Sequence, residues 1–92
     1  MRITKHLKIH GRVQGVGFRY FTIQQAKELG INGWVTNRSD GTVEALLQGK
    51  VASVDEMIER LHRGPIAAKV TEIKEIPVTD SPENYRHFTV RR

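Results

Sequence analysis

The spacing of apolar residues changes at defined points along this chain, and the order of these changes limits the possible folds more than any other feature of the sequence. From residue 3 to residue 13 apolar and polar side chains alternate, broken only by Lys5 and Gly11, which predicts a half-buried β-strand. After residue 18 the spacing becomes helical, because Thr22, Ala26 and Leu29 fall at i, i+4 and i+7. The chain is therefore expected to begin with a strand that leads directly into a helix.

The rest of the chain divides into short elements by the same reasoning. Asp40-Gly41 favours a hairpin turn, because both residues tolerate a positive φ at low cost. The segment from Ser53 to Glu56 has the capping-box pattern, which predicts the start of a second helix. After the first helix, which Gly30 ends, the expected elements are a strand over 33–36, a turn over 37–41, a strand over 42–48 closed by Gly49, a helix from Ser53 that ends before Gly64, a strand over 69–76 with a bulge, a polar loop over 79–84 and a short strand over 88–90.

This order is strand-helix-strand-strand-helix-strand, with one further strand at the C-terminus. Each strand-helix-strand crossover should be right-handed, and the central pair of strands should be an antiparallel hairpin. Two such halves interleave into an α+β, ferredoxin-like sandwich: a mixed, mainly antiparallel sheet with two helices on one face. At 92 residues we expect a single domain over 1–92. The fold alone does not identify a function, since many activities share it.

Composition excludes several kinds of chemistry. The chain has no cysteine, so disulfides, thiolate nucleophiles and cysteine-ligated metals are ruled out. The N-terminus lacks an apolar run of signal-peptide length, and no segment has the apolar length of a membrane span, so we expect a cytoplasmic protein without a membrane partner. We also expect a monomer, because no strong apolar stripe remains after the core is assigned. A formal net charge of +5 favours anionic partners.

The segment between the first strand and the first helix is the clearest candidate for a binding site. A helix N-terminus offers unpaired N–H groups and a partial positive charge, and the glycines at 15 and 17 let the backbone curl around an anion. Arg19, in the first turn, is unfavourable beside the helix dipole unless an anion is bound. The alternative is an ordinary glycine-rich turn with an exposed arginine. The dinucleotide-binding and Walker motifs both fail, because Tyr20 replaces the third glycine of the first and no Gly-Lys-Ser/Thr is present.

Two motifs resemble the signatures of the acylphosphatase family. The run Ile9 to Arg19 matches the first signature at every constrained position. The run Gly33 to Asn37, followed by Gly41, Val43 and Gly49 at the right intervals, is similar to the second. The two motifs cover residues 9 to 49 in the correct order, and the remaining elements agree with the ferredoxin-like fold of that family.

The resemblance implies an acylphosphatase, which hydrolyses an acyl phosphate to a carboxylate and inorganic phosphate. The loop arginine that binds the phosphoryl group in that family corresponds to Arg19, and the asparagine that orients the attacking water corresponds to Asn37. The implied phosphate-binding loop consists of Gln14, Gly15, Val16, Gly17, Phe18 and Arg19. We expect no metal and no cofactor, because a carboxylate is a good leaving group and the loop amides with Arg19 can supply the positive charge.

The chain departs from the family pattern at two places. Thr36 stands where a basic residue is more common, which predicts altered electrostatics for the substrate. The C-terminus ends in Arg91-Arg92 where many members have an aromatic residue, which predicts different side-chain contacts near the site. Neither departure removes a proposed catalytic group.

Two other functions stay open at this stage. RNA-recognition domains share this fold, and the run Gly15 to Phe21 superficially resembles their aromatic motif, although it should open a helix and not line a central strand. A small-ligand regulatory or subunit-interface domain would bind phosphate without turnover. A metal site is not expected, since His6 and His10 should lie roughly 13 Å apart along a strand.

Overall fold

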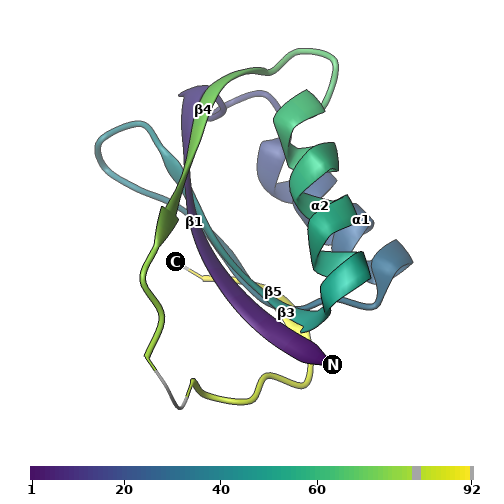
Figure 1. The fold of residues 1–92 in the computed structure, drawn as a ribbon. Helices are drawn as coiled ribbons and strands as arrows, with labels where there is room; N and C mark the ends of the chain where they lie inside the picture. The colour runs from purple at the N-terminus through teal and green to yellow at the C-terminus, as the bar shows by residue number, and fades with distance from the viewer. Residues whose placement is uncertain (80–81, 92) are drawn as a thin grey trace.

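The protein consists of two layers, a five-stranded sheet and two helices that cover one of its faces (Figure 1). The computed structural model describes residues 1–79 and 82–91. The elements, in chain order, are β1 (Arg2–Arg12), α1 (Phe18–Leu29), β2 (Asn32–Asn37), β3 (Val43–Lys50), α2 (Val51–Arg63), β4 (Lys69–Ile76) and β5 (Phe88–Val90). This is the α+β, ferredoxin-like sandwich that the change in periodicity predicts.

The strands are ordered β4-β1-β3-β2-β5 across the sheet. Three neighbouring pairs are antiparallel (β4 with β1, β1 with β3 and β3 with β2), and β2 with β5 is parallel. It follows that β1, β2 and β5 all run in the same direction. Their C-terminal ends therefore meet at one end of the sheet, and α1 begins there because it follows β1 after a short loop.

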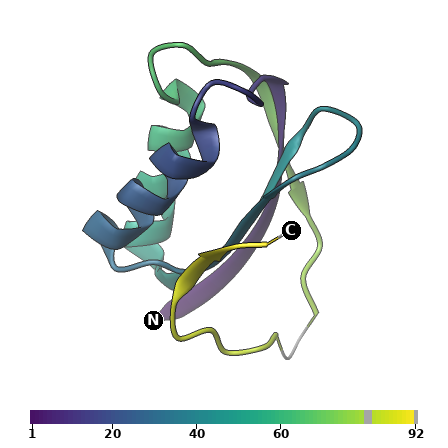
Figure 2. The same ribbon diagram turned by 180° about the vertical axis from the view of Figure 1, so that it is seen from behind.

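The core lies between the helices and the sheet. Leu7 and Ile9 of β1 face the helices, which is the outcome that the alternation predicts. From α2, Val54, Met57 and Leu61 are each 0% exposed and fill the other side of the core. Helix α1 packs against β2 and β5, whereas α2 packs against β1, β3 and β4. Figure 2, seen from behind, shows α1 and β5 on the same side of the molecule.

Helix α2 starts earlier than its capping-box pattern predicts. Strand β3 continues through Gly49 to Lys50, and the helix begins at Val51 with no loop between the two elements. Ser53 therefore lies inside the first turn and makes no cap, while the amide of Val51 donates to the carbonyl of Met1 at 3.2 Å. The prediction of a Ser53 cap is wrong, because the N-terminal residue supplies a backbone acceptor that sequence spacing does not reveal.

The other boundaries agree closely with the predictions. The expected bulge is found where β4 pairs with β1, since His10 pairs with Glu72 and Gly11 with Val70, so that Thr71 is the extra residue. Gly30 ends α1 in a left-handed conformation, as predicted. Of the predicted loop 79–84, residues 80–81 lie outside the described part of the chain.

Candidate active site

The loop between β1 and α1 has the backbone conformation that an anion-binding turn requires. Gly15 and Gly17 have φ values of 74° and 78°, a left-handed region that other residues adopt at a cost of about 1–2 kcal/mol. Gly17 is the N-cap of α1, and its carbonyl accepts the hydrogen bond of the Phe21 amide at 3.0 Å. No chain carbonyl in the described residues accepts from the amides of residues 15 to 20 outside the regular elements. These donors are therefore available to a ligand.

The charge distribution at this helix start also favours an anion. The first turn of α1 contains no acidic residue, and no side chain caps the helix. Arg19 is exposed and forms no ion pair with any described residue. A guanidinium, unpaired backbone donors and the positive end of a helix thus coincide, as in other sites for phosphate and carboxylate ions.

A pocket of about 350 Å³ opens beside this loop and brings the two predicted catalytic residues together. Arg19 reaches it from the first turn of α1, and Asn37 reaches it from the C-terminal end of β2. The Oδ1 atom of Asn37 is buried and has no hydrogen-bond partner among the described residues. An unsatisfied buried acceptor of this kind calls for a bound water or ligand. The pocket is lined by Gly15, Gly17, Phe18, Arg19, Tyr20, Ile23, Asn37 and Val90.

The residues of the predicted phosphate loop do not all line the pocket. Four of them line the pocket, namely Gly15, Gly17, Phe18 and Arg19. Phe18 is 1% exposed, so its ring fixes the helix start in the core. Val16 packs against the core and Gln14 points toward the turn between β2 and β3; neither lines the pocket.

Gln14 connects the loop to the turn that follows Asn37. Its Nε2 atom donates to the carbonyls of Arg38 at 2.7 Å and of Thr42 at 2.8 Å. These two bonds define what we call the loop–turn link, and they set the position of the phosphate loop relative to β2. The sequence places Gln14 in the loop but does not reveal this contact, because its partners lie 24 and 28 residues away.

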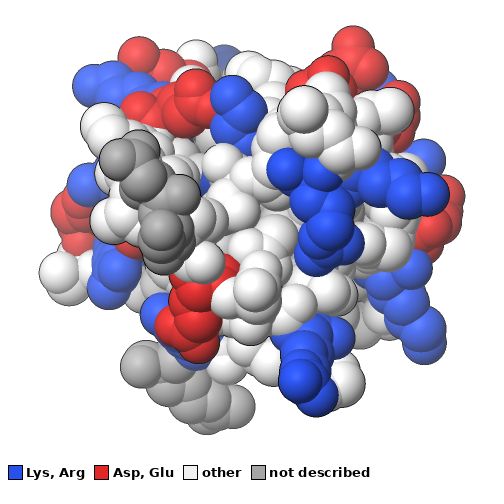
Figure 3. Space-filling view, turned by 60° about the horizontal axis from the view of Figure 1, so that its bottom comes forward, with Lys and Arg blue, Asp and Glu red and all other residues white. Residues whose placement is uncertain are grey.

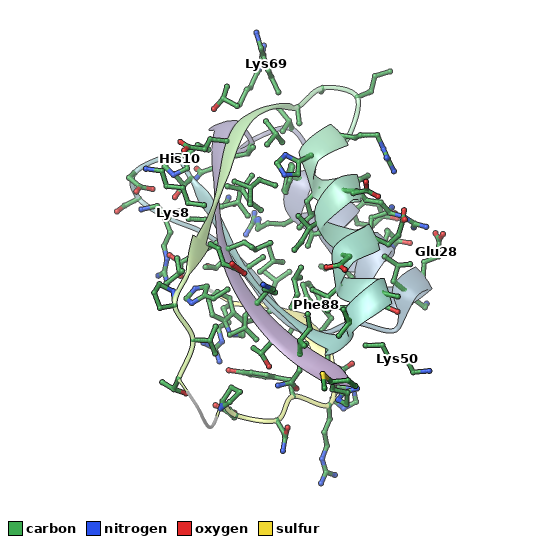
Figure 4. All side chains as sticks on the ribbon, in the orientation of Figure 1. Lys8, His10, Glu28, Lys50, Lys69 and Phe88 are labelled. Carbon is green, nitrogen blue, oxygen red and sulfur yellow. The ribbon has the colours of Figure 1, made fainter. Side chains whose placement is uncertain are left out.

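A second network holds the turn from the open face of the sheet. Arg38 donates from Nε and Nη2 to the two carboxylate oxygens of Glu44 at 3.0 and 2.9 Å, and His6 donates to Glu44 at 2.9 Å. The hydrogen bond from Arg38 is the main cause that lowers the pKa of Glu44 to about 2. Lys8 and Thr42 likewise hold the pKa of Asp40 well below its usual range. Lys8 and His10 lie on the side of the sheet away from the helices (Figure 4).

Thr36, which departs from the family pattern, lies on the face of β2 that points away from the helices. Val35 is on the helix side and Asn37 reaches the pocket, so Thr36 points the other way, as alternation requires. Its hydroxyl donates to the carbonyl of Arg91 at 2.8 Å, and the Arg91 guanidinium lies 4.6 Å from the centroid of the Trp34 ring. Thr36 does not line the pocket, and its contacts connect the C-terminal segment to β2.

The structure adds little support for the other functions that the sequence left open. The aromatic run that resembles an RNA-binding motif ends in α1, as expected, and does not line a central strand. On the face drawn in Figure 3, groups of Lys and Arg are interspersed with Asp and Glu around a mostly uncharged centre. Within residues 1–79 and 82–91, no three His, Asp or Glu side chains are grouped as metal ligands would be. No described helix has the length and apolar character needed to cross a membrane.

The fold and the site together define a class: a small α+β domain with a glycine-rich loop that leaves backbone donors unpaired at the start of its first helix, and with a carboxamide in the pocket beside that loop. Comparison with known proteins makes this more specific. A sequence profile of the acylphosphatase family matches residues 5–90. The chain belongs to the acylphosphatase family, and the class of enzyme that the two sequence motifs predict is confirmed.

Individual relatives agree with this assignment over most of their length. The acylphosphatase of Paraburkholderia xenovorans is 54% identical over 70 residues, which is 76% of this chain and 72% of that protein. The acylphosphatase of Thermococcus kodakarensis is 44% identical over 97% of this chain and 96% of its own length. The crystal structure of acylphosphatase from Bacillus subtilis matches with a TM-score of 0.92 at 36% identity and covers 100% of both chains. The fold is therefore that of solved acylphosphatases.

Proposed function

We propose that the chain hydrolyses the bond between carboxyl and phosphate groups in acyl phosphates, with Arg19 and the loop amides as the phosphoryl-binding groups and Asn37 as the group that orients the attacking water. The water oxygen bonds to phosphorus as the bond to the acyl oxygen breaks. The carboxylate leaves with that electron pair. One proton of the water passes to a phosphate oxygen, and the products are a carboxylate and inorganic phosphate.

For this reaction the protein needs mainly to position the reactants and to stabilise negative charge on the phosphoryl oxygens. A carboxylate is a weak base, so it leaves without a general acid, and phosphoryl transfer depends mainly on alignment and on stabilising the equatorial oxygens. Arg19 and the amides at the start of α1 supply donors for those oxygens. The carboxamide of Asn37 has both a donor and an acceptor, so it can hold a water without removing its proton.

One observation supports this proposal above the others. The pocket that contains Arg19 also contains Asn37, whose buried Oδ1 lacks a partner among the described residues. A water bonded to that oxygen would lie between the C-terminal end of β2 and the loop before α1, and in-line attack requires it to stand opposite the departing acyl oxygen.

The test is hydrolysis of benzoyl phosphate by the purified protein in excess chelator, with inorganic phosphate added as an inhibitor. We expect full activity in chelator and competitive inhibition by phosphate, because both anions need the same donors. Activity that disappears with chelator would contradict the metal-free mechanism. Phosphate binding without any turnover would contradict the enzymatic function and favour a regulatory domain.

A further inference from the structure

A second pocket, of about 320 Å³, lies between α1, β5 and the segment that precedes β5. Ile23 lines both pockets, so the two adjoin at that side chain, and we call the pair of pockets the acyl groove. Strand β5 forms the opposite wall, with Val90 in the first pocket and Phe88 in the second. Phe88 lies between the sheet and the helices (Figure 4). The middle of the acyl groove is therefore apolar.

One stripe of α1 places a cation at each end of the acyl groove. Arg19, Ile23 and Lys27 are spaced i, i+4 and i+8, which puts them on one side of a helix. Arg19 lines the first pocket and Lys27 lines the second. At 1.5 Å of rise per residue, their Cα atoms are separated by about 12 Å along the helix axis.

The end of the acyl groove farthest from Arg19 has more cationic side chains than the dipole of α1 alone explains. Lys27 alone would be explained by its place in the last turn of α1, where a cation suits the helix dipole. Arg86 and His87, however, come from the segment before β5 and line the same pocket. Neither Lys27 nor Arg86 forms an ion pair with a described residue. A charged group of opposite sign would satisfy both.

We propose that the acyl groove binds the acyl part of the substrate, and that the preferred acyl group is an apolar chain that ends in a carboxylate held by Lys27 and Arg86. The inference rests on the proposed function, because it takes the phosphoryl group as bound at Arg19. The chain lies against Ile23, Val90 and Phe88. Carbon–carbon bonds of about 1.5 Å and the reach of both cationic side chains fit a chain of roughly six to eight carbon atoms.

The experiment uses phosphonates, which bind like the substrate but cannot be hydrolysed. Calorimetry compares 7-phosphonoheptanoate with heptylphosphonate, which lacks the carboxylate, and with 3-phosphonopropionate, which is too short to reach the far end. The variants are the double substitution Lys27→Ala and Arg86→Ala, and Arg63→Ala as a control. Arg63 is an exposed arginine at the end of α2 that lines neither pocket of the groove.

We expect 7-phosphonoheptanoate to bind the wild-type protein about tenfold more tightly than heptylphosphonate, a typical effect of charge-assisted hydrogen bonds. The double variant should lose this advantage and keep its affinity for heptylphosphonate, and Arg63→Ala should change neither. The short probe should show no effect of the double substitution.

Equal binding of the two long probes to the wild-type protein, or equal weakening of both in the double variant, would overturn the inference. If neither long probe binds although benzoyl phosphate is hydrolysed, the acyl groove proposal fails and the proposed function stands. If benzoyl phosphate is not hydrolysed, the proposed function fails, and the phosphonate comparison still reports on the groove.

Discussion

Arg19 combines an unfavourable position for folding with a favourable one for binding. A cation in the first turn opposes the helix dipole by about 0.3–1 kcal/mol. No described acidic residue neutralises it, and its guanidinium is exposed beside the pocket. Its position does not stabilise α1, and it fits the proposed role in binding the phosphoryl group. This separates its effect on activity from its effect on stability.

Replacement of Arg19 by alanine should lower kcat/KM for benzoyl phosphate by at least about 10²–10³-fold, the loss typical of a donor to transition-state charge. Inhibition by inorganic phosphate should also disappear. The free energy of unfolding, measured in urea, should stay the same or rise by a few tenths of a kcal/mol, because an unfavourable charge is removed. The control is Arg63→Ala, which should leave turnover unchanged. Full activity of Arg19→Ala would contradict the assignment.

Asn37 should affect the chemical step more than phosphate binding. We expect Asn37→Ala to reduce kcat by about 10²-fold or more, while the inhibition constant for phosphate changes little, since the water and not the phosphoryl group loses its partner. Steady-state kinetics with benzoyl phosphate and phosphate measure both quantities. Asn84→Ala, which changes an exposed asparagine outside the pocket, is the matched control. An equal loss in kcat and in phosphate affinity would argue against a water-orienting role.

At the scale of elements, the site depends on how the phosphate loop is held against the turn between β2 and β3. The loop–turn link through Gln14 is the described side-chain contact that joins them directly. Both acceptor carbonyls also receive a backbone hydrogen bond, from Gly41 to Arg38 and from Arg38 to Thr42. Loss of the link should therefore loosen the loop without leaving an unpaired carbonyl.

Gln14→Leu should lower the free energy of unfolding by about 1–2 kcal/mol, the net worth of two hydrogen bonds. It should also lower kcat, because the distance between the phosphate loop and Asn37 is no longer fixed. Urea unfolding and benzoyl phosphate kinetics test the two effects. Gln24→Leu, at an exposed position of α1, makes the same chemical change away from the turn and should be near wild type in both. Unchanged kinetics in Gln14→Leu would show that the link has no part in catalysis.

The ion pair between Arg38 and Glu44 gives the hairpin a predictable response to acid. The folded pKa of Glu44 is about 2, against an ordinary value of 4.5, so its contribution to stability is complete above about pH 4.5 and is lost as the pH falls toward 2. Glu44→Gln should therefore be less stable than wild type at pH 7 and lose less stability between pH 5 and pH 2.5. Unfolding in urea across this range measures the difference. Glu59→Gln, an exposed carboxylate of α2, should keep the wild-type slope.

The sequence predicts elements that are defined by their own residues and misses features that depend on distant ones. The alternation in β1, the stripe of α1 and the bulge in β4 were all readable from local spacing, and each is confirmed. The start of α2 could not be predicted in this way, because the amide of its first residue, Val51, donates to the carbonyl of the distant Met1. Arg19 and Asn37 could be named from motifs, whereas the second half of the acyl groove joins Lys27 to Arg86 across 59 residues of sequence and has no local signal.

At the scale of the whole molecule, the pocket is built by three widely separated parts of the chain. The loop and α1 supply one wall, β2 supplies Asn37, and Val90 of the last strand completes it. The parallel pairing of β5 with β2 brings the last strand to the same end of the sheet as the phosphate loop. Strand β5 therefore forms both the edge of the sheet and one wall of the pocket.

Removal of β5 should thus reduce both stability and activity. A chain that ends at His87 loses Phe88 and Val90, which pack against the core, and we expect a loss of a few kcal/mol in the free energy of unfolding. Its kcat/KM for benzoyl phosphate should fall by about tenfold or more under conditions in which circular dichroism shows that it is folded, because the pocket is open on one side. A chain that ends at Val90 is the control.

That control keeps the pocket wall and loses the backbone bond from Arg91 to Val35 and the Thr36 bond to Arg91. We expect it to be less stable than the full chain and close to it in kcat/KM, since both lost bonds lie outside the pocket. Equal activity of the folded 1–87 chain and the full chain would show that β5 stabilises the sheet without contributing to the site. Equal losses of activity in both shortened chains would instead point to Arg91 and to the far face of β2.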